Sequence, residues 1–301
     1  MIPNCFTRRT ALILLSSTAA LPLAAQDRPV VAAGNYPLAY FAERLGGGNV
    51  EVLFLVPTET DPPLWRPGIS DIAAIQGADV IALNGADFST WPTKASLPRS
   101  RTVDTSAGFA DRMITTETLT HSHGESGEHS HLATASYTWL DFSLAMEQAK
   151  VLAAAMARQI PEQASAIAAR RDDLLSDLAA LDARAAALAG NAGVGPIIAS
   201  HPRYQYFGAA YDLAISAVEW DAREAPSEAQ WAALERLITE TGANLFIWEA
   251  EPSPAARERM SALGVIDVVF PPLANAPADG SFVELMDASL DRLEDAFQQA
   301  R

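Results

Sequence analysis

Residues 163–189 read QASAIAARRDDLLSDLAALDARAAALA, and the fold prediction starts from this segment. Its apolar stripe contains two series of residues spaced seven apart. The first series is Ile167, Leu174, Leu181 and Leu188, and the second is Leu178 and Ala185. This spacing predicts one uninterrupted amphipathic helix. Pro161 before the stretch and Gly190 after it are the predicted start and stop signals. At about 1.5 Å per residue the helix would be roughly 40 Å long, which suits a rigid strut.

Strands and helices are predicted on both sides of this helix. Short apolar runs predict strands at residues 29–33, 50–56, 78–83 and 101–104 before it, and at 196–200, 214–218, 244–249 and 265–270 after it. Helical spacing occurs at residues 37–45, 71–76, 204–211, 228–241, 255–263 and 282–299. Ser70 is the predicted cap of the second of these helices. The strands argue against the alternatives, a helical bundle or a short coiled coil.

Strands that alternate with helices imply parallel sheets. The predicted fold class is therefore α/β, with two α/β lobes, each a parallel sheet covered by helices, joined by one long rigid helix. The N-terminal lobe is predicted at residues 26–160, the linking helix at 161–190 and the C-terminal lobe at 191–301. We expect the functional site in the cleft between the lobes.

The composition excludes some classes of function. A formal charge of -16 argues against nucleic acid as a partner, because a phosphate backbone needs a basic surface. The chain has no Gly-x-Ser-x-Gly elbow, no glycine-rich phosphate loop and no His-Glu-x-x-His motif. We therefore predict that the protein is not an enzyme.

Residues 1–25 have the order of a secretory signal peptide. Arg8 and Arg9 precede an apolar run at residues 11–25, and polar residues follow it. That run is short for a membrane span. The one cysteine, Cys5, precedes the run, so we expect cleavage after Ala25 to leave a secreted protein without disulfides.

Four of the five histidines lie in a loop at residues 120–132, and they are His121, His123, His129 and His131. Glu125 and Glu128 lie between them. Imidazole and carboxylate groups suit borderline divalent ions such as Zn²⁺. A loop rich in glycine and serine would lose entropy on ordering, so it should hold metal more weakly than a preformed site. The alternative is a hydrophilic insertion whose histidines have no role.

The fifth histidine, His201, directly follows a predicted strand, residues 196–200, and directly precedes a predicted helix. Open α/β sheets bind ligands in the loops at the carboxyl ends of their strands. His201 is therefore a candidate ligand. The alternative is an imidazole that only caps the end of the strand through a hydrogen bond.

Further motifs carry a family resemblance over the whole predicted mature chain. They are Asn35-Tyr36-Pro37-Leu38, Asp61-Pro62, residues 67–71, 78–81 and 84–86, Trp139-Leu140-Asp141, Ser200-His201, Tyr206-Phe207, and Glu249 with Ser253-Pro254. With these the chain resembles the solute-binding proteins of zinc and manganese ABC importers. The histidine-rich insertion before Trp-Leu-Asp is typical of the zinc-binding branch.

The resemblance implies the helix-linked fold of the cluster A-I class of solute-binding proteins. It also implies a transported divalent cation, Zn²⁺ or Mn²⁺ or a similar ion, held between the lobes. The implied partners are an ABC permease of the inner membrane and, as a further candidate, a periplasmic metal chaperone. We expect a periplasmic monomer.

The chain departs from the family at its metal ligands. By the resemblance, the four ligand positions fall at Pro63, Tyr137, His201 and near Pro271. Only His201 keeps a side chain that coordinates zinc readily, and the acids closest to the fourth position are Asp267 and Asp279. One imidazole cannot hold Zn²⁺ tightly, because tight sites use three or four fixed ligands.

Three interpretations follow, and the first is our leading prediction. In the first, the cleft still binds metal through His201, a loop histidine such as His131, and acids from the set Glu59, Asp61 and Glu249. In the second, the cleft takes a non-metal solute or a metal chelate in a pocket made of Pro63, Trp65, Arg66, Tyr137, His201 and Tyr204. The aromatic residues of that pocket could equally pack at the lobe interface. In the third, the cleft is inactive and the loop histidines buffer metal.

Overall fold

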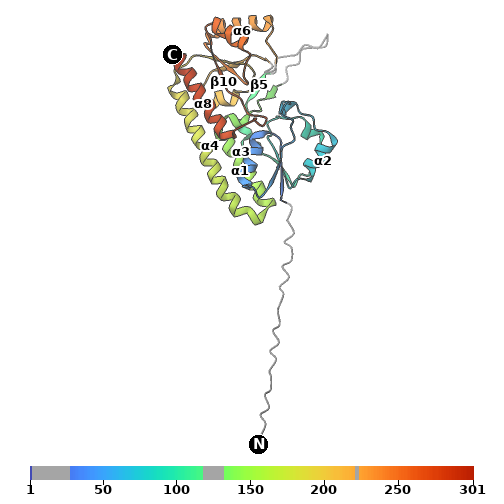
Figure 1. Cartoon of the computed structure of the whole chain (residues 1–301). Helices are drawn as coiled ribbons and strands as arrows, with labels where there is room; N and C mark the ends of the chain where they lie inside the picture. The colour runs from blue at the N-terminus through green and yellow to red at the C-terminus, as the bar shows by residue number, and fades with distance from the viewer. Residues whose placement is uncertain (2–27, 118–131, 221–223) are drawn as a thin grey trace.

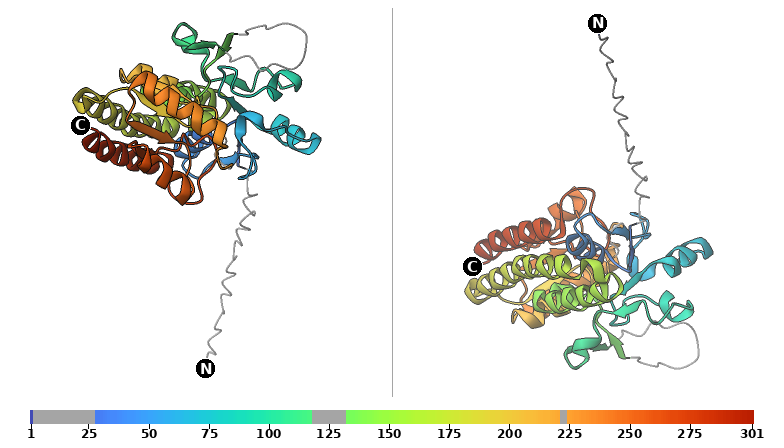
Figure 2. Two further views of the ribbon diagram at one scale, coloured as in Figure 1. Left: turned by 90° about the horizontal axis from the view of Figure 1, so that it is seen from above. Right: turned by 90° about the horizontal axis from the view of Figure 1, so that it is seen from below.

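The computed structural model describes residues 1, 28–117, 132–220 and 224–301. The predicted signal peptide after Met1 and the four loop histidines lie outside these described residues. Figures 1 and 2 show two α/β lobes with one long helix running beside both, so the predicted fold class is confirmed. No helix within the described ranges is long and apolar enough to cross a membrane.

The first lobe is built on a parallel sheet with the strand order β2-β1-β3-β4. Its strands are β1 (Val30–Ala33), β2 (Glu51–Leu53), β3 (Val80–Leu83) and β4 (Thr102–Asp104). Its helices are α1 (Tyr36–Gly46), α2 (Ile69–Gly77) and α3 (Phe142–Gln159). Successive strand residues point to opposite faces, so Val31 joins the core beneath α1 and α3, whereas Ala32 joins a separate cluster on the other face.

The second lobe repeats this plan with the strand order β10-β9-β7-β8. Its strands are β7 (Ile197–Ala199), β8 (Ile215–Ala217), β9 (Leu245–Trp248) and β10 (Ile266–Val269). Its helices are α5 (Gln205–Ala210), α6 (Glu228–Thr241), α7 (Pro254–Ala262) and α8 (Phe282–Gln299). Ile197 and Ile198 again divide between two cores, one facing α4 and one containing residues of α6 and α7.

Smaller elements connect these layers. An antiparallel pair, β5 (Thr115–Glu117) with β6 (Leu132–Thr134), flanks the histidine-rich segment. Short 3₁₀ turns lie at Pro62–Leu64, Trp91–Lys94, Ala107–Arg112, Thr138–Leu140 and Pro161–Gln163. Both the hairpin and helix α3 are additional to the elements predicted from the sequence.

The long helix α4 spans Ala164–Ala192, as the apolar stripe predicts, but its predicted end is wrong. Gly190 lies inside the helix, and Gly193 adopts the left-handed conformation, with φ of 56°, that ends it. Glycine reaches this conformation without the steric cost that other residues meet, which suits Gly193 to the position that ends the helix.

The predicted start of α2 is also wrong. Gly68, and not Ser70, is the residue before the first helical position. The Asp71 side chain accepts a hydrogen bond from the Gly68 backbone N–H at 2.8 Å, so this carboxylate closes the first turn. Ser70 lies within that turn and is exposed.

Helix α4 connects the cores of both lobes. It packs against α1 and α3 of the first lobe and against α8 of the second. Leu174 and Leu178 are fully buried, and they belong to one continuous apolar cluster that includes Val31 of the first sheet and Ile247 of the second. The two lobes therefore share a core, which limits how far they can move apart.

We predict that Leu178→Ala lowers the free energy of unfolding by about 2–5 kcal/mol, because it leaves a cavity in the shared core. Urea denaturation followed by circular dichroism measures this loss. Ser176→Ala, at an exposed position of the same helix, is the matched control and should change stability by no more than about 0.5 kcal/mol. A loss at Leu178 no larger than that of the control would contradict the shared core.

Candidate functional site

The candidate site is a cleft of about 920 Å³ between the two lobes. The first lobe contributes the loop after β2 and the residues just before the turn at Thr138–Leu140. The second lobe contributes the loops at the carboxyl ends of β7, β9 and β10. The wall is formed by residues 58–64, 136–137, 201–203, 219, 249–250 and 271–275. This is the position that parallel α/β sheets favour for ligands.

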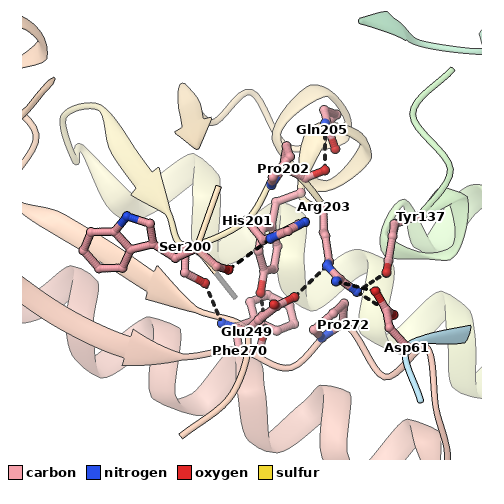
Figure 3. Close-up of polar contacts among 12 residues, drawn as sticks. Asp61, Tyr137, Ser200, His201, Pro202, Arg203, Gln205, Glu249, Phe270 and Pro272 are labelled. Carbon is pink, nitrogen blue, oxygen red and sulfur yellow. Dashed lines mark hydrogen bonds and ion pairs between the residues drawn. The ribbon is translucent and has the colours of Figure 1, made fainter. Parts of the chain in front are cut away.

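Arg203 lies at the centre of the polar contacts in this cleft (Figure 3). It donates to both carboxylate oxygens of Asp61, from Nη1 to Oδ1 at 3.1 Å and from Nη2 to Oδ2 at 2.8 Å. Its Nε lies 2.6 Å from Oε2 of Glu249. Nη1 also donates to the Tyr137 hydroxyl, and Cζ lies 4.9 Å from the centre of the Tyr137 ring. The guanidinium thus bridges the second lobe, which holds Arg203 and Glu249, to the first.

Burial controls the charge states of this cluster. It raises the pKa of Tyr137 above its ordinary range, because a phenolate there would lose its hydration, and Arg203 opposes the rise only in part. Tyr137 is therefore a neutral phenol near pH 7. Burial lowers the pKa of Arg203, but the negative charges of Glu249 and Asp61 raise it, so the guanidinium keeps its charge.

His201 lies on the wall of the cleft beyond the end of β7, as predicted. Its Nδ1 lies 3.1 Å from the backbone oxygen of Trp220. A carbonyl oxygen can only accept, so Nδ1 carries the proton and Nε2 presents its lone pair. Metal-binding histidines have this arrangement, in which a backbone carbonyl orients the ring through the other nitrogen.

The structure brings together only some of the predicted site residues. Six of them, namely Glu59, Asp61, Pro63, Tyr137, His201 and Glu249, line the cleft, together with Pro271. Glu249 is held in place because its backbone N–H donates to Ser200 Oγ at 3.1 Å. The loop histidines His121, His123, His129 and His131 lie outside the described residues.

Three residues of the predicted solute pocket do not line the cleft, which corrects that part of the prediction. Trp65 is buried inside the first lobe, with its ring 5.9 Å from that of Trp91. Arg66 is exposed to solvent. Tyr204 is buried in the second lobe and donates to the backbone oxygen of Phe270 at 2.6 Å. Burial in the interior of a lobe therefore explains why Trp65 and Tyr204 are aromatic.

The two acids considered for the fourth ligand position are also outside the cleft. Asp267 accepts a hydrogen bond from Trp248 Nε1 at 3.0 Å and pairs with Arg257 at 3.6 Å. Asp279 is exposed. Neither can complete a site around His201.

Arg203 is the functional residue that the sequence analysis did not identify. A signal was available, because Arg203 lies two residues after His201 at the end of a strand, in a chain with 21 basic and 37 acidic side chains. Basic side chains are fewer than acidic ones in this chain, so an arginine beside the predicted ligand loop indicates an ion pair with acidic side chains across the cleft.

A divalent cation such as Zn²⁺ is held by three or four donor side chains that converge on it. Within the described part of the chain, no three side chains of His, Cys, Asp or Glu are grouped closely enough to share an ion. Asp61 and Glu249, two of the predicted metal ligands, are instead both engaged by Arg203. In this state a guanidinium, and not a set of open ligands, occupies the middle of the cleft.

Two α/β lobes bridged by one long helix, with a polar cleft between them, define a helix-linked solute-binding protein. The chain belongs to the family described as "Zinc-uptake complex component A periplasmic", whose model matches residues 31–296. This match confirms the resemblance stated above. It also supports the prediction of a binding protein and not an enzyme.

Curated relatives agree with this assignment. The chain is 24% identical over 308 residues to the zinc-binding lipoprotein AdcA of Streptococcus pneumoniae, an alignment that covers 95% of this chain and 61% of AdcA. It therefore spans about three fifths of that relative. It is 24% identical over 278 residues to the high-affinity zinc uptake system protein ZnuA of Bacillus subtilis, covering 87% of this chain and 85% of ZnuA.

Solved structures share the fold. The metal-dependent lipoprotein YcdH of Bacillus subtilis superposes with a TM-score of 0.74 at 23% identity, covering 89% of this chain and 98% of YcdH. The solute-binding protein FpvC of Pseudomonas aeruginosa in complex with Mn²⁺ superposes with a TM-score of 0.73 at 20% identity, covering 92% and 100%.

We predict that Glu249→Gln lowers the free energy of unfolding by about 1–3 kcal/mol, because it removes the charge that pairs with a buried guanidinium. Asp61→Asn should cost less, since the Asp61 side chain is 28% exposed whereas that of Glu249 is 8% exposed. Urea denaturation at pH 7 measures both losses.

Glu219→Gln is the control for these variants. It removes an exposed carboxylate from the same cleft wall and should change stability by no more than about 0.5 kcal/mol. The reverse order, with Asp61→Asn the more damaging change, would show that burial does not govern the strength of these contacts.

Proposed function

We propose that this chain is the solute-binding component of an ABC importer, that it captures a divalent cation, zinc in the first place, between its lobes, and that it delivers the cation to a membrane permease. One observation carries this proposal most directly. His201, with its tautomer fixed by Trp220, lies on the wall of an acidic interlobe cleft. The family match and the zinc-binding relatives support zinc as the first cation to test.

The charge of the cleft favours a cation. Among the described residues, four carboxylates, those of Glu59, Asp61, Glu219 and Glu249, line it together with one guanidinium, that of Arg203. These five groups carry a formal charge of about minus three at pH 7. Such a cleft attracts multivalent cations and repels anionic solutes.

The donor chemistry suits zinc once Arg203 moves aside. Nε2 of His201 and the carboxylates of Asp61 and Glu249 are the nitrogen and oxygen donors that Zn²⁺ accepts. For these three donors to share one ion with a water in a tetrahedral site, their side chains must also move closer together, because no three such groups among the described residues are near enough to do so in this structure. Tyr137, a neutral phenol, would contribute a hydrogen bond and no charge.

A second candidate solute is an organic cation or a metal chelate. The volume of about 920 Å³ is near the upper end of pockets that hold small molecules and is far larger than a bare ion needs. The pairing of Asp61 and Glu249 with Arg203 also favours a solute larger than a bare ion.

The remaining parts of the proposal follow from family membership. The family description places its members in the periplasm and assigns them to zinc uptake. We propose the same compartment for this chain, reached through the predicted signal peptide, and a monomer as the form that docks on the permease.

We predict that the secreted protein binds one Zn²⁺ in the cleft and that His201→Ala weakens this binding at least about tenfold, the equivalent of one lost ligand contact of about 1.4 kcal/mol. Competition with a chromogenic chelator measures the affinity, and elemental analysis measures the stoichiometry. A variant in which the four loop histidines are replaced by asparagine is the matched control and should keep the cleft site.

The opposite pattern identifies the alternatives. Loss of binding in the loop variant alone would assign metal handling to the histidine-rich segment. Absence of zinc binding in the intact protein, together with a thermal shift from an organic cation or a chelate, would assign the cleft to the second candidate.

A further inference from the structure

Arg203 reaches across the cleft in the way that a shared cation would. Its Nε contacts Glu249 of the second lobe, while its two terminal nitrogens contact Asp61 and Tyr137 of the first. Figure 3 shows the guanidinium between these groups, on the same cleft wall as His201. The chain thus supplies its own positive charge where the carboxylates of the two lobes meet.

The contacts of Arg203 are matched to its shape. A planar guanidinium donates in parallel to a carboxylate, and this two-point geometry is stronger and more directional than a single ion pair. The Arg203 side chain is only 11% exposed, so solvent screens these contacts weakly. An incoming cation must therefore replace a well-formed set of bonds.

Other contacts hold the lobes together without Arg203. Trp139 Nε1 donates to the Pro272 backbone oxygen at 2.7 Å. Asn275 Nδ2 donates to the Thr60 backbone oxygen at 2.8 Å. These uncharged bonds between the lobes and the shared core on α4 keep the cleft formed, so removal of Arg203 should free its carboxylates without separating the lobes.

We propose that Arg203 is the residue that determines cation affinity and specificity in the cleft, because it acts as an internal cation that the solute must displace. The inference rests on the proposed function only in taking the solute to be a cation. A divalent ion can displace the guanidinium because it brings twice the charge to the two carboxylates. A monovalent ion brings no more charge than Arg203 and none of its directed hydrogen bonds.

The test compares Zn²⁺ affinity in two variants of the full chain that each remove one positive charge. Both variants also have the four loop histidines replaced by asparagine, so that the measured affinity is that of the cleft alone. Arg203→Met should bind Zn²⁺ at least about tenfold more tightly than its parent, since a hydrogen bond to a charged group is worth about that factor. Arg66→Met, at an exposed position outside the cleft, should change the affinity by no more than about twofold because solvent screens its charge.

Each outcome decides the inference. Equal or weaker binding by Arg203→Met would overturn it, and so would equal tightening by Arg66→Met, which would indicate a general effect of charge. Zinc binding by Arg203→Met with none by its parent would support the inference and reject zinc capture by the natural chain. No zinc binding by either protein would reject both.

A measurement on the unmodified chain keeps the inference testable if Arg203→Met folds poorly. Titration with Zn²⁺ should shift the Arg203 Nε–H resonance in the NMR spectrum as Nε loses Glu249. An unchanged resonance in the zinc-loaded protein would overturn the inference. Arg203→Gln, which keeps one amide donor, is the second variant and should tighten binding in the same direction.

Discussion

The structure depends on the burial of one apolar stripe of α4 by helices from both lobes. Leu174 and Leu178 are inaccessible to solvent, and the cluster around them runs without a break from the first sheet to the second. Polar contacts fix the same helix at both ends. Arg170 donates to the backbone oxygen of Gly46 at 3.0 Å in the first lobe, while Arg184 pairs with Asp287 and Asp291 of α8 in the second.

A shared core has consequences for how the cleft can work. Lobes joined only by a flexible linker could open widely, but here any opening must disturb packing around α4. Recognition of the solute therefore depends on side chains that rearrange while the two lobes keep nearly the same relative position. The cleft walls are loops at the carboxyl ends of parallel strands, held by backbone contacts between the lobes such as that from Tyr36 N to Ala274 O at 2.9 Å.

The limits of two helices were predicted to the residue, whereas Ser70 and Gly190 gave wrong helix limits and apolar runs predicted strand limits poorly. The helices at Glu228–Thr241 and Phe282–Gln299 agree with the prediction to the residue, because Ser227 and Ser281 form capping boxes with residues three positions later. The apolar run at residues 50–56 is buried only at Val50 and Val56, Glu51 within it is exposed, and only Glu51–Leu53 pairs as a strand. Pairing requires a neighbouring strand alongside, and a run of apolar letters carries no information about that neighbour.

Apolar periodicity in the sequence is enough to predict the two α/β lobes, the linking helix and the position of His201 at a strand end. The sequence also supplied Asp61, Glu249 and Tyr137 as candidates around the cleft. The contacts of Arg203 with all three could not be predicted in this way, because Arg203 and Asp61 are 142 residues apart and meet only when the lobes pack together. The same packing buried Trp65 and Tyr204 away from the cleft, since the sequence records that a side chain is aromatic but not which core it fills.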